Sequence, residues 1–287
     1  DAQPVKNRPV SASPTLRGRW RRFALGLPTV LGMKPRGWFI PHRYAPLLPP
    51  PGAQPPYPAI EQLFESRLAD FTAVIDAVDA QATALEGLKG LLDQSWFPSL
   101  DAAVAYALVR DRKPRRIVEV GSGHSTRLLS KAQGGLGEIL AVDPAPRADI
   151  ADLPGVRVVP STLQAAPPEI LDGLQSGDAL FIDSSHILMP GSDVDILLNR
   201  VLPNLPAGVL VHIHDIFLPY DYPAIWGWRA YNEQQGVMPL LATGAYTPLF
   251  ASAWAERRLA DRLASSVVAR LPRLPDALPA SLWLEKR

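Results

Sequence analysis

The sequence predicts an α/β protein with a mostly parallel sheet. Short apolar runs alternate along the chain with stretches whose apolar residues recur at helical spacing. Repeated strand and helix units of this length indicate parallel strands with helices on both faces of the sheet. The last two runs, separated by a polar, proline-containing stretch, would complete a seven-stranded sheet. The expected strands are residues 117–120, 139–142, 156–159, 179–182, 208–213, 249–253 and 281–284.

The first of these strands runs into a glycine turn and then into a helix that Leu128 and Leu129 open. Gly121 and Gly123 permit positive backbone angles and leave no side chain between the turn and a ligand. The free amides at the start of the helix would face an anionic group. The turn Gly121, Ser122 and Gly123 therefore predicts a nucleotide-like cofactor, although the same glycine pair also occurs in turns that bind nothing.

The type of cofactor depends on three neighbouring residues. Asp143 ends the second strand twenty residues after Gly123, where its carboxylate can bind both hydroxyls of a ribose. A dinucleotide site usually has a third glycine, and here that position is Thr126. Glu119 precedes the turn at a place suited to the methionine part of S-adenosylmethionine (SAM). These features favour SAM over NAD.

Polar residues follow the fourth and fifth strands, as Asp183-Ser-Ser-His186 and His212-Ile-His-Asp215. Ligands of open α/β sheets bind at the carboxyl ends of the strands. We expect Asp183, His214 and Asp215 to surround one divalent cation, with His186 free at the rim. The metal would lower the pKa of a hydroxyl to be methylated, and His186 would remove the proton.

Each of these residues also has a structural explanation. An Asp at a strand end often caps a helix, and a strand histidine is more often a hydrogen-bonded core residue than a ligand. We favour the structural role for His212 and the functional role for Asp183 with Asp215. Four aromatic residues after the fifth strand either pack or form the wall of an acceptor pocket; they are Tyr220, Tyr222, Trp226 and Trp228.

Composition limits the classes of protein that remain. Apolar residues at 47% and charged residues at 20% describe an ordinary globular chain. The absence of cysteine excludes disulfides and thiolate chemistry. No apolar run reaches the roughly 20 residues of a membrane-spanning helix, so we expect a cytoplasmic protein. The sequence starts with Asp1 instead of Met, and we expect that it has been trimmed or processed.

The chain divides by composition into three parts. Seven prolines between Pro46 and Pro58 indicate an extended connection. After it, apolar spacing of three and four predicts one helix over residues 58–92, and a second helix is expected over 99–110. The expected parts are a basic, Pro-rich N-terminal extension (1–57), a helical lid or dimerisation segment (58–112) and a catalytic domain (113–287).

Charge is distributed unevenly. Residues 1–60 carry nine Lys or Arg and one acid, which leaves 20 basic and 27 acidic residues for the remainder. The basic 17–22 and apolar 23–33 segments loosely imitate a signal peptide, but Pro28 interrupts the pattern and no cleavage site follows. The extension could instead touch a membrane surface, the domain or a partner subunit. The acidic body argues against nucleic acid as a partner.

Together these residues resemble a class I SAM-dependent methyltransferase, within a bacterial subgroup of small-molecule and sugar-tailoring enzymes. The resemblance covers about residues 95–287. It implies a Rossmann-like sheet, a methionine site at Glu119, Gly121 and Gly123, and a ribose site at Asp143. The motifs that carry it are 119–126, 181–186 and 281–286.

The spacing of Asp183 and His186 is similar to that of macrolide-sugar O-methyltransferases, where the acid binds magnesium and the histidine is the base. Two acids follow strand five in those enzymes. Here His214 takes the first position and only Asp215 is retained, which leaves magnesium, a softer metal or no metal. The resemblance thus implies His186, Asp183 and His214 as catalytic residues, with Asp183 also beside the cofactor. Two further runs, 221–223 and 232–234, resemble the subgroup without an assigned role.

The predicted function is O-methylation of a small hydroxylated natural product or sugar by SAM. We expect a small-molecule acceptor, no nucleic acid and a homo-oligomer. The alternatives are an N-methyltransferase of a small molecule or peptide, and a non-catalytic subunit with a SAM-binding fold. An NAD-linked oxidoreductase is a further class, and the missing third glycine argues against it.

Overall fold

The computed structural model describes residues 16–34 and 36–287. Residues 1–15 and 35 of the predicted extension lie outside the described residues. The chain forms two compact units, one made of the described residues up to 55 with 221–231, the other of 56–220 with 232–287. The second unit contains the sheet.

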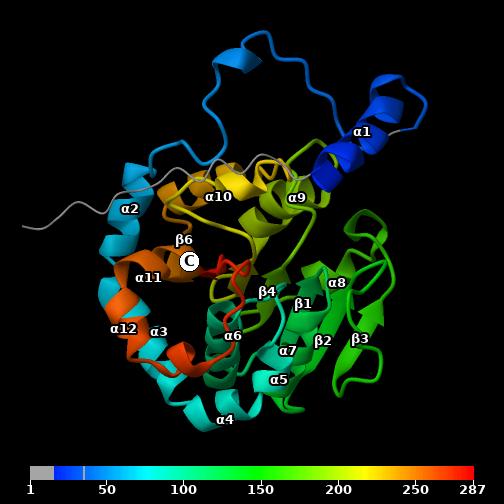
Figure 1. Ribbon diagram of the computed structural model, residues 1–287. Helices are drawn as coiled ribbons and strands as arrows, with labels where there is room; N and C mark the ends of the chain where they lie inside the picture. Colours follow the sequence, from blue (N-terminus) through cyan, green and yellow to red (C-terminus); the bar gives the residue numbers. More distant parts are fainter. Residues whose placement is uncertain (1–15, 35) are drawn as a thin grey trace, which may run out of the picture. The chain divides into compact units, whose positions relative to one another are not determined.

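The sheet has seven strands in the order β3-β2-β1-β4-β5-β7-β6 (Figure 1). Strands β1 to β5 pair in parallel, and β7 is antiparallel to both β5 and β6. This confirms the predicted Rossmann-like, mostly parallel sheet. The strands are β1 (Arg116–Val120), β2 (Glu138–Val142), β3 (Val156–Val159), β4 (Ala179–Ile182), β5 (Leu210–Ile213), β6 (Tyr246–Ala251) and β7 (Leu282–Lys286).

The boundaries of β1 to β5 agree with the expected strands to within two residues. Every residue of β4 and β5 is buried, which explains their continuous apolar runs. The expected strand 249–253 is displaced, because β6 begins at Tyr246 and a helix starts at Ser252. An irregularity between Pro248 and Phe250 interrupts the pairing of β6 and hides its first half from the sequence pattern.

Helices cover both faces of the sheet. On one face α6 (Ser99–Arg112) packs against α7 (His124–Gln133). Between β4 and β5 lies α9 (Asp193–Ile196), which the usual right-handed crossover would place on the other face. After α9 the chain continues as a π-helical turn. The remaining elements of this unit are η3 (Leu197–Val201), η4 (Leu202–Asn204), η2 (Leu163–Ala165), α8 (Glu169–Asp172), α10 (Glu233–Ala242), α11 (Ser252–Arg258), α12 (Ala260–Ala264) and η6 (Val267–Arg270).

The single helix expected over residues 58–92 is four helices. They are α2 (Pro58–Glu65), α3 (Leu68–Asp79), α4 (Ala82–Gly87) and α5 (Lys89–Leu92). The apolar spacing continues through the breaks, so periodicity could not reveal them. Phe64 and Phe71 are fully buried and both rings contact Trp254. This apolar stripe is therefore part of the chain's own core, and the lid or dimerisation role stays a prediction.

The first unit contains α1 (Leu16–Val30), η1 (Ala45–Leu47) and η5 (Ala224–Trp226). After η1 the proline-rich segment up to residue 55 has no helix or strand, as its composition predicts. Asp221 Oδ2 accepts a hydrogen bond from the amide of Gly52 at 2.8 Å, which ties the two parts of this unit together. Across the described residues, no helix is both long and apolar enough to cross a membrane.

Candidate active site

The glycine turn is packed tightly between strand ends. Gly121 has a φ of 79°, and a Cβ added there would lie 1.9 Å from the carbonyl oxygen of Asp183. A Cβ on Gly123, whose φ is 153°, would lie 3.2 Å from the Cβ of Arg147. Packing therefore requires glycine at 121, and the backbone angle would strain any other residue at 123. Gly123 is also the residue before α7, whose first amides have no partner within the helix.

Glu119 lies beneath the turn and is fully buried. Its Oε1 accepts a hydrogen bond from Ser125 Oγ and its Oε2 accepts one from Thr126 Oγ1, both at 2.6 Å. Burial raises the pKa of Glu119 to about 8, and the two hydroxyl groups offset only part of that effect. Thr126 Oγ1 also accepts from the Gly123 amide at 2.9 Å. Glu119 thus holds the turn from below, and its predicted contact with the methionine part of a cofactor stays a prediction.

Asp143 joins the ends of β1 and β2. Its Oδ2 accepts hydrogen bonds from the amide of Ser122 at 2.7 Å and from Ser122 Oγ at 3.0 Å. Its Oδ1 accepts from the amide of Ala145 at 2.7 Å. The structure therefore brings the predicted residues Ser122 and Asp143 together beside the two glycines.

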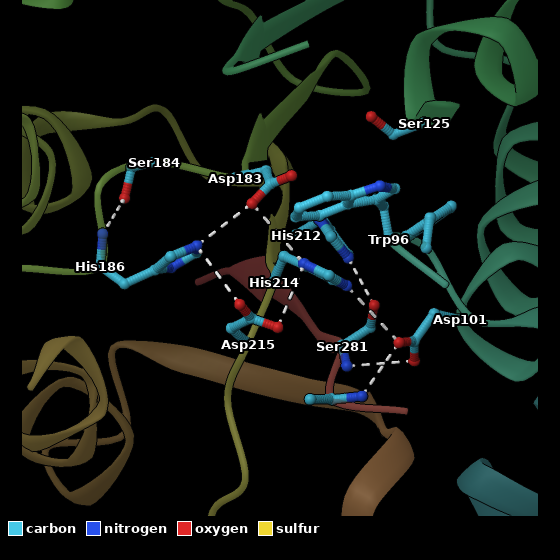
Figure 2. Close-up of polar contacts among 12 residues, drawn as sticks. Trp96, Asp101, Ser125, Asp183, Ser184, His186, His212, His214, Asp215 and Ser281 are labelled. Atoms are coloured by element: carbon cyan, nitrogen blue, oxygen red, sulfur yellow. Dashed lines mark hydrogen bonds and ion pairs between the residues drawn. The ribbon is translucent and has the colours of Figure 1, made fainter. Parts of the chain in front are cut away.

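Four predicted residues meet at the ends of β4 and β5, and we call Asp183, His186, His214 and Asp215 the strand-end cluster. Figure 2 shows both imidazoles pointing toward the two carboxylates. His186 Nε2 lies 3.2 Å from Asp183 Oδ1 and 3.5 Å from Asp215 Oδ2. His214 Nδ1 lies 3.6 Å from Asp183 Oδ1 and 3.4 Å from Asp215 Oδ1. The four side chains thus form one ring of alternating acids and imidazoles.

Glu233 holds the far side of His186, and sequence reasoning did not identify it. Its Oε2 lies 2.9 Å from His186 Nδ1, and its side chain is fully buried in the first turn of α10. Its neighbours anchor the same segment: Asn232 Oδ1 accepts from the Leu188 amide, and Gln234 Oε1 accepts from the Phe217 amide. The run 232–234, which had no assigned role, therefore positions the cluster.

Asp101 stands on the far side of His214 and was also missed. Its Oδ2 lies 3.7 Å from His214 Nε2. The same carboxylate accepts hydrogen bonds from the amides of Ala280, at 2.9 Å, and Ser281, at 3.1 Å. Its position in the first turn of α6, among apolar residues, resembles an ordinary helix start and gave no sign of this contact.

Exposure separates the members of the cluster. The side chains of His186, His214 and Asp215 are 5%, 6% and 9% exposed, whereas that of Asp183 is 23% exposed. Asp183 is therefore the member that a ligand reaches most readily. The expectation that His186 stands free at the rim is wrong, because carboxylates contact both of its ring nitrogens.

The charges of the cluster depend on one another. Burial alone would lower the pKa of His186, but the hydrogen bonds to Asp183 and Glu233 outweigh it and raise the pKa well above the usual value. Burial opposes the charged form of His214 too, and the carboxylates around it raise its pKa well above the usual value. Burial would raise the pKa of Asp183, yet the two imidazoles hold it well below the usual value. The neighbouring carboxylates thus favour the protonated form of both imidazoles.

The backbone is strained at two members of the cluster. His186 has a φ of 60° and Asp215 a φ of 56°, in the left-handed region that non-glycine residues rarely adopt. Such a conformation costs on the order of 1–3 kcal/mol and persists where the surroundings enforce it. The carbonyl of His186 accepts from the Asn232 amide at 3.1 Å, which helps to hold this conformation. Strain of this kind is common at functional sites.

His212 has the structural role that we favoured. It is fully buried and stacks on Phe181 with ring centroids 3.7 Å apart. Its Nε2 lies 2.7 Å from Ser281 Oγ. Burial holds the pKa of His212 well below the usual value, so the ring is neutral.

The predicted metal ligands Asp183, His214 and Asp215 are close together, but their arrangement is not that of a metal site. Within the described residues, no group of three or more His, Cys, Asp or Glu side chains is arranged to hold a metal ion. The imidazole nitrogens of the cluster face carboxylate oxygens instead. Metal binding by these residues therefore stays a prediction.

Trp96 and Arg147 border the glycine turn and were not predicted. The Trp96 side chain is exposed, and the Arg147 guanidinium lies 4.6 Å from its ring centroid. The Arg147 amide donates to the Ser122 carbonyl at 3.3 Å. Of the four aromatic residues considered for an acceptor pocket, Tyr220 lies in this unit and carries Arg257 over its ring. The pocket role of Tyr222, Trp226 and Trp228, which belong to the other unit, stays a prediction.

A family model described as a methyltransferase domain matches residues 118–216. The matched segment begins in β1 and ends just after β5, so it contains the glycine turn, Asp143 and the strand-end cluster. The match supports the expected class: the segment 118–216 is a methyltransferase domain.

Several solved structures are similar in fold. One is the O-methyltransferase TomG from Streptomyces achromogenes, involved in tomaymycin synthesis and in complex with SAM, which is 16% identical. The alignment covers 74% of this chain and 88% of TomG, with a TM-score of 0.38. An O-methyltransferase from Bacillus cereus in complex with SAH is 13% identical. The alignment covers 75% of this chain and 91% of that one, with a TM-score of 0.38. A methyltransferase from Geobacter sulfurreducens is 15% identical. The alignment covers 73% of this chain and 88% of that one, with a TM-score of 0.40. The search of curated proteins found no match.

Proposed function

We propose that this enzyme methylates a hydroxyl group of a small hydroxylated acceptor, a natural product or a sugar. The main support for this proposal is the geometry of His186. Glu233 holds its Nδ1 at 2.9 Å, and its Nε2 faces Asp183, the most exposed carboxylate of the cluster. A hydroxyl acceptor has one proton to lose, and this pair of side chains is built to take a proton.

The residues around the glycine turn fit SAM. Gly121, Ser122 and Gly123 would hold the methionine part through backbone groups, and Asp143, at the end of β2, would bind the ribose. The close contact between Gly121 and the Asp183 carbonyl places Asp183 beside the same turn. When bound, SAM would give its methyl group to the acceptor oxygen, with its sulfur–methyl bond broken and S-adenosylhomocysteine released.

The strand-end cluster would handle the proton. Asp183 would accept a hydrogen bond from the acceptor hydroxyl, because its side chain is the one exposed to a ligand. As the new O–C bond forms, the O–H bond breaks and the proton passes to the pair of Asp183 and His186. His214 contacts Asp183 from the other side and keeps that carboxylate charged. His186 must be neutral beforehand, so turnover requires a pH near or above its raised pKa.

A divalent metal at Asp183, His214 and Asp215 stays part of the proposal and has a direct test. Exhaustive chelation followed by dialysis would abolish turnover if a metal is needed, and Mg²⁺ or Mn²⁺ would restore it. Turnover that survives chelation would leave proton transfer to the side chains alone.

The first experiment is calorimetric titration of S-adenosylhomocysteine (SAH) into the purified protein. We expect a dissociation constant in the micromolar range, since KM values of enzymes lie at roughly 1 μM to 1 mM. Asp143→Ala should lose this binding, whereas Asp152→Ala, which removes an exposed acid from the loop after β2, should keep it. Binding of NAD in place of SAH would contradict the proposal.

Other assignments need separate measurements. Mass spectrometry of the methylated product would distinguish an oxygen acceptor from the nitrogen of a small molecule or peptide. A non-catalytic subunit would keep its biological activity when Asp183 and His186 are both replaced by Ala. The expected homo-oligomer and the cytoplasmic location stay predictions, which light scattering and cell fractionation can check.

A further inference from the structure

Exposed apolar side chains are concentrated in the first unit. Of the 17 exposed large hydrophobic residues in the described chain, 12 lie between residues 20 and 48. An ordinary monomer surface scatters such residues singly, so their concentration in one segment indicates an interaction site. We call these 12 side chains the exposed apolar face; they are Trp20, Phe23, Leu27, Val30, Leu31, Met33, Trp38, Phe39, Ile40, Tyr44, Leu47 and Leu48.

The part of this face on α1, drawn in dark blue in Figure 1, is one stripe of a helix. At about 100° per residue, positions 20, 23, 27 and 30 lie within an arc of roughly 80°. The Trp20 and Phe23 rings meet edge to face with centroids 6.0 Å apart. Arg21 and Arg22 lie outside the arc. The helix therefore has an apolar side and a basic side.

The charge of the same segment has a single sign. Residues 16–55 contain seven Lys or Arg and no Asp or Glu. Basic residues stand at both ends of the apolar stripe, with Arg22 near its start and Lys34 just after it. A partner for this segment must therefore be apolar and anionic together.

We propose that the exposed apolar face docks on an anionic phospholipid bilayer, with α1 lying in the plane of the interface. A helix with Trp, Phe and Leu on one side and Arg on the other has the features of interfacial helices. Trp20 and Trp38 suit the headgroup region, where amphipathic rings gather. Nucleic acid would match the charge but leave the Leu, Val, Ile and Met side chains without a partner.

Affinity would come from two sources that can be separated. Insertion of the aromatic and aliphatic side chains removes apolar area from water in any bilayer. Attraction of Lys and Arg to anionic lipid adds about fivefold in partitioning for each basic residue near the surface. Binding should therefore need anionic lipid and weaken as salt rises.

The test is flotation of the full chain with vesicles of phosphatidylcholine alone or with about 30% phosphatidylglycerol. We expect co-flotation with the anionic vesicles, at least tenfold weaker binding to the neutral ones, and loss of binding in high salt. The variant Trp20→Ser with Phe23→Ser, and the variant Arg21→Glu with Arg22→Glu, should each lose roughly tenfold or more.

Matched controls lie on the other unit. Leu136→Ser removes an exposed apolar side chain, and Arg157→Glu reverses an exposed charge. Both variants should bind the anionic vesicles as well as the unchanged chain does. Circular dichroism should show that all four variants are folded, since every position altered is exposed.

Three results would overturn the proposal. Equal binding to both vesicle types would show that charge plays no part. Absence of binding to either type would exclude the bilayer. Concentration-dependent self-association that the Trp20→Ser, Phe23→Ser variant abolishes, without vesicle binding, would assign the face to a second copy of the chain.

Discussion

The ends of β1 and β2 and the ends of β4 and β5 lie along one edge of the sheet, and both contain buried carboxyl groups. At the first, Glu119 faces only hydroxyl groups, and burial raises its pKa to about 8, so it is mostly protonated at neutral pH. At the second, imidazoles face the carboxylates of Asp183 and Asp215 and hold the pKa of Asp183 well below its usual value. The region at β1 and β2 avoids a buried charge, and the region at β4 and β5 pairs buried acids with imidazoles.

The difference matches the work proposed for each region. A neutral, hydrogen-bonded support fixes a turn without attracting a competing cation to it. A ring of acids and imidazoles can gain or lose a proton with little rearrangement, which suits general base catalysis. The comparison can be tested by removing a key group from each region.

The largest effect is expected for His186→Ala. Loss of the imidazole should lower kcat by about 10²–10⁴-fold, which is the usual contribution of a general base. SAH affinity should stay nearly unchanged, because the cofactor residues lie at β1 and β2. Steady-state kinetics with labelled SAM and calorimetry measure the two quantities, and His42→Ala, in the exposed extension, is the control. Equal loss of affinity and turnover would remove the assignment of His186 as base.

The next effect concerns the pH dependence of the same region. Because the pKa of His186 is raised above the usual value, kcat/KM should increase as pH rises through that raised pKa. Glu233→Gln keeps the size and a hydrogen-bond acceptor but removes a charge that favours the imidazolium. The rising limb should therefore move to lower pH. Glu138→Gln, on β2, should leave the limb where it is, and an unmoved limb in Glu233→Gln would contradict the coupling.

The third effect tests the neutral region through stability. Between pH 4.5 and about 8 the folded chain holds a proton on Glu119 that the unfolded chain has released. The contribution of Glu119 to the stability of the folded chain is therefore fully present below pH 4.5. It is lost as the pH rises to about 8. Glu119→Gln does not titrate, so the difference in melting temperature, variant minus unchanged chain, should rise from pH 5 to pH 9. Glu86→Gln, whose carboxyl has a lowered pKa, should show no such rise over this range.

The smallest effect is expected for Ser281→Ala, which removes the hydroxyl that contacts the neutral, buried His212. The unfolding free energy in urea should fall by about 1–3 kcal/mol, the cost of a buried polar group left without its partner. Turnover by the folded enzyme should stay within about twofold, since His212 is outside the cluster. Ser265→Ala, at an exposed position, is the control for the loss of a hydroxyl.

Much of the fold could be predicted from sequence because buried parallel strands have short apolar runs with clear boundaries. The run at 179–182 corresponds at both ends to the fully buried β4, and the run at 156–159 corresponds to β3 although that strand is only partly buried. The division of 58–92 into four helices could not be predicted, since turns of one or two residues do not disturb the apolar spacing. The start of β6 was missed because Pro248 and an irregular pairing interrupt the strand pattern.

The residues of the candidate site that directly follow a strand could be predicted from the sequence. Asp183, His214 and Asp215 were expected together because they follow the fourth and fifth strands, and His186 was expected at the rim. Glu233 was out of reach, because it comes 47 residues after His186 and only tertiary packing brings the two together. The burial of His186 follows from that same contact, which explains why the expected free position at the rim was wrong.

The contact between Gly121 and the Asp183 carbonyl affects how a mutational scan of this enzyme should be interpreted. Any side chain at residue 121 would displace the backbone at the end of β4 as well as the turn itself. A Gly121→Ala enzyme would then show weak cofactor binding and slow turnover from a single methyl group. In such a scan, position 121 would score as a catalytic residue although its own atoms take no part in the reaction.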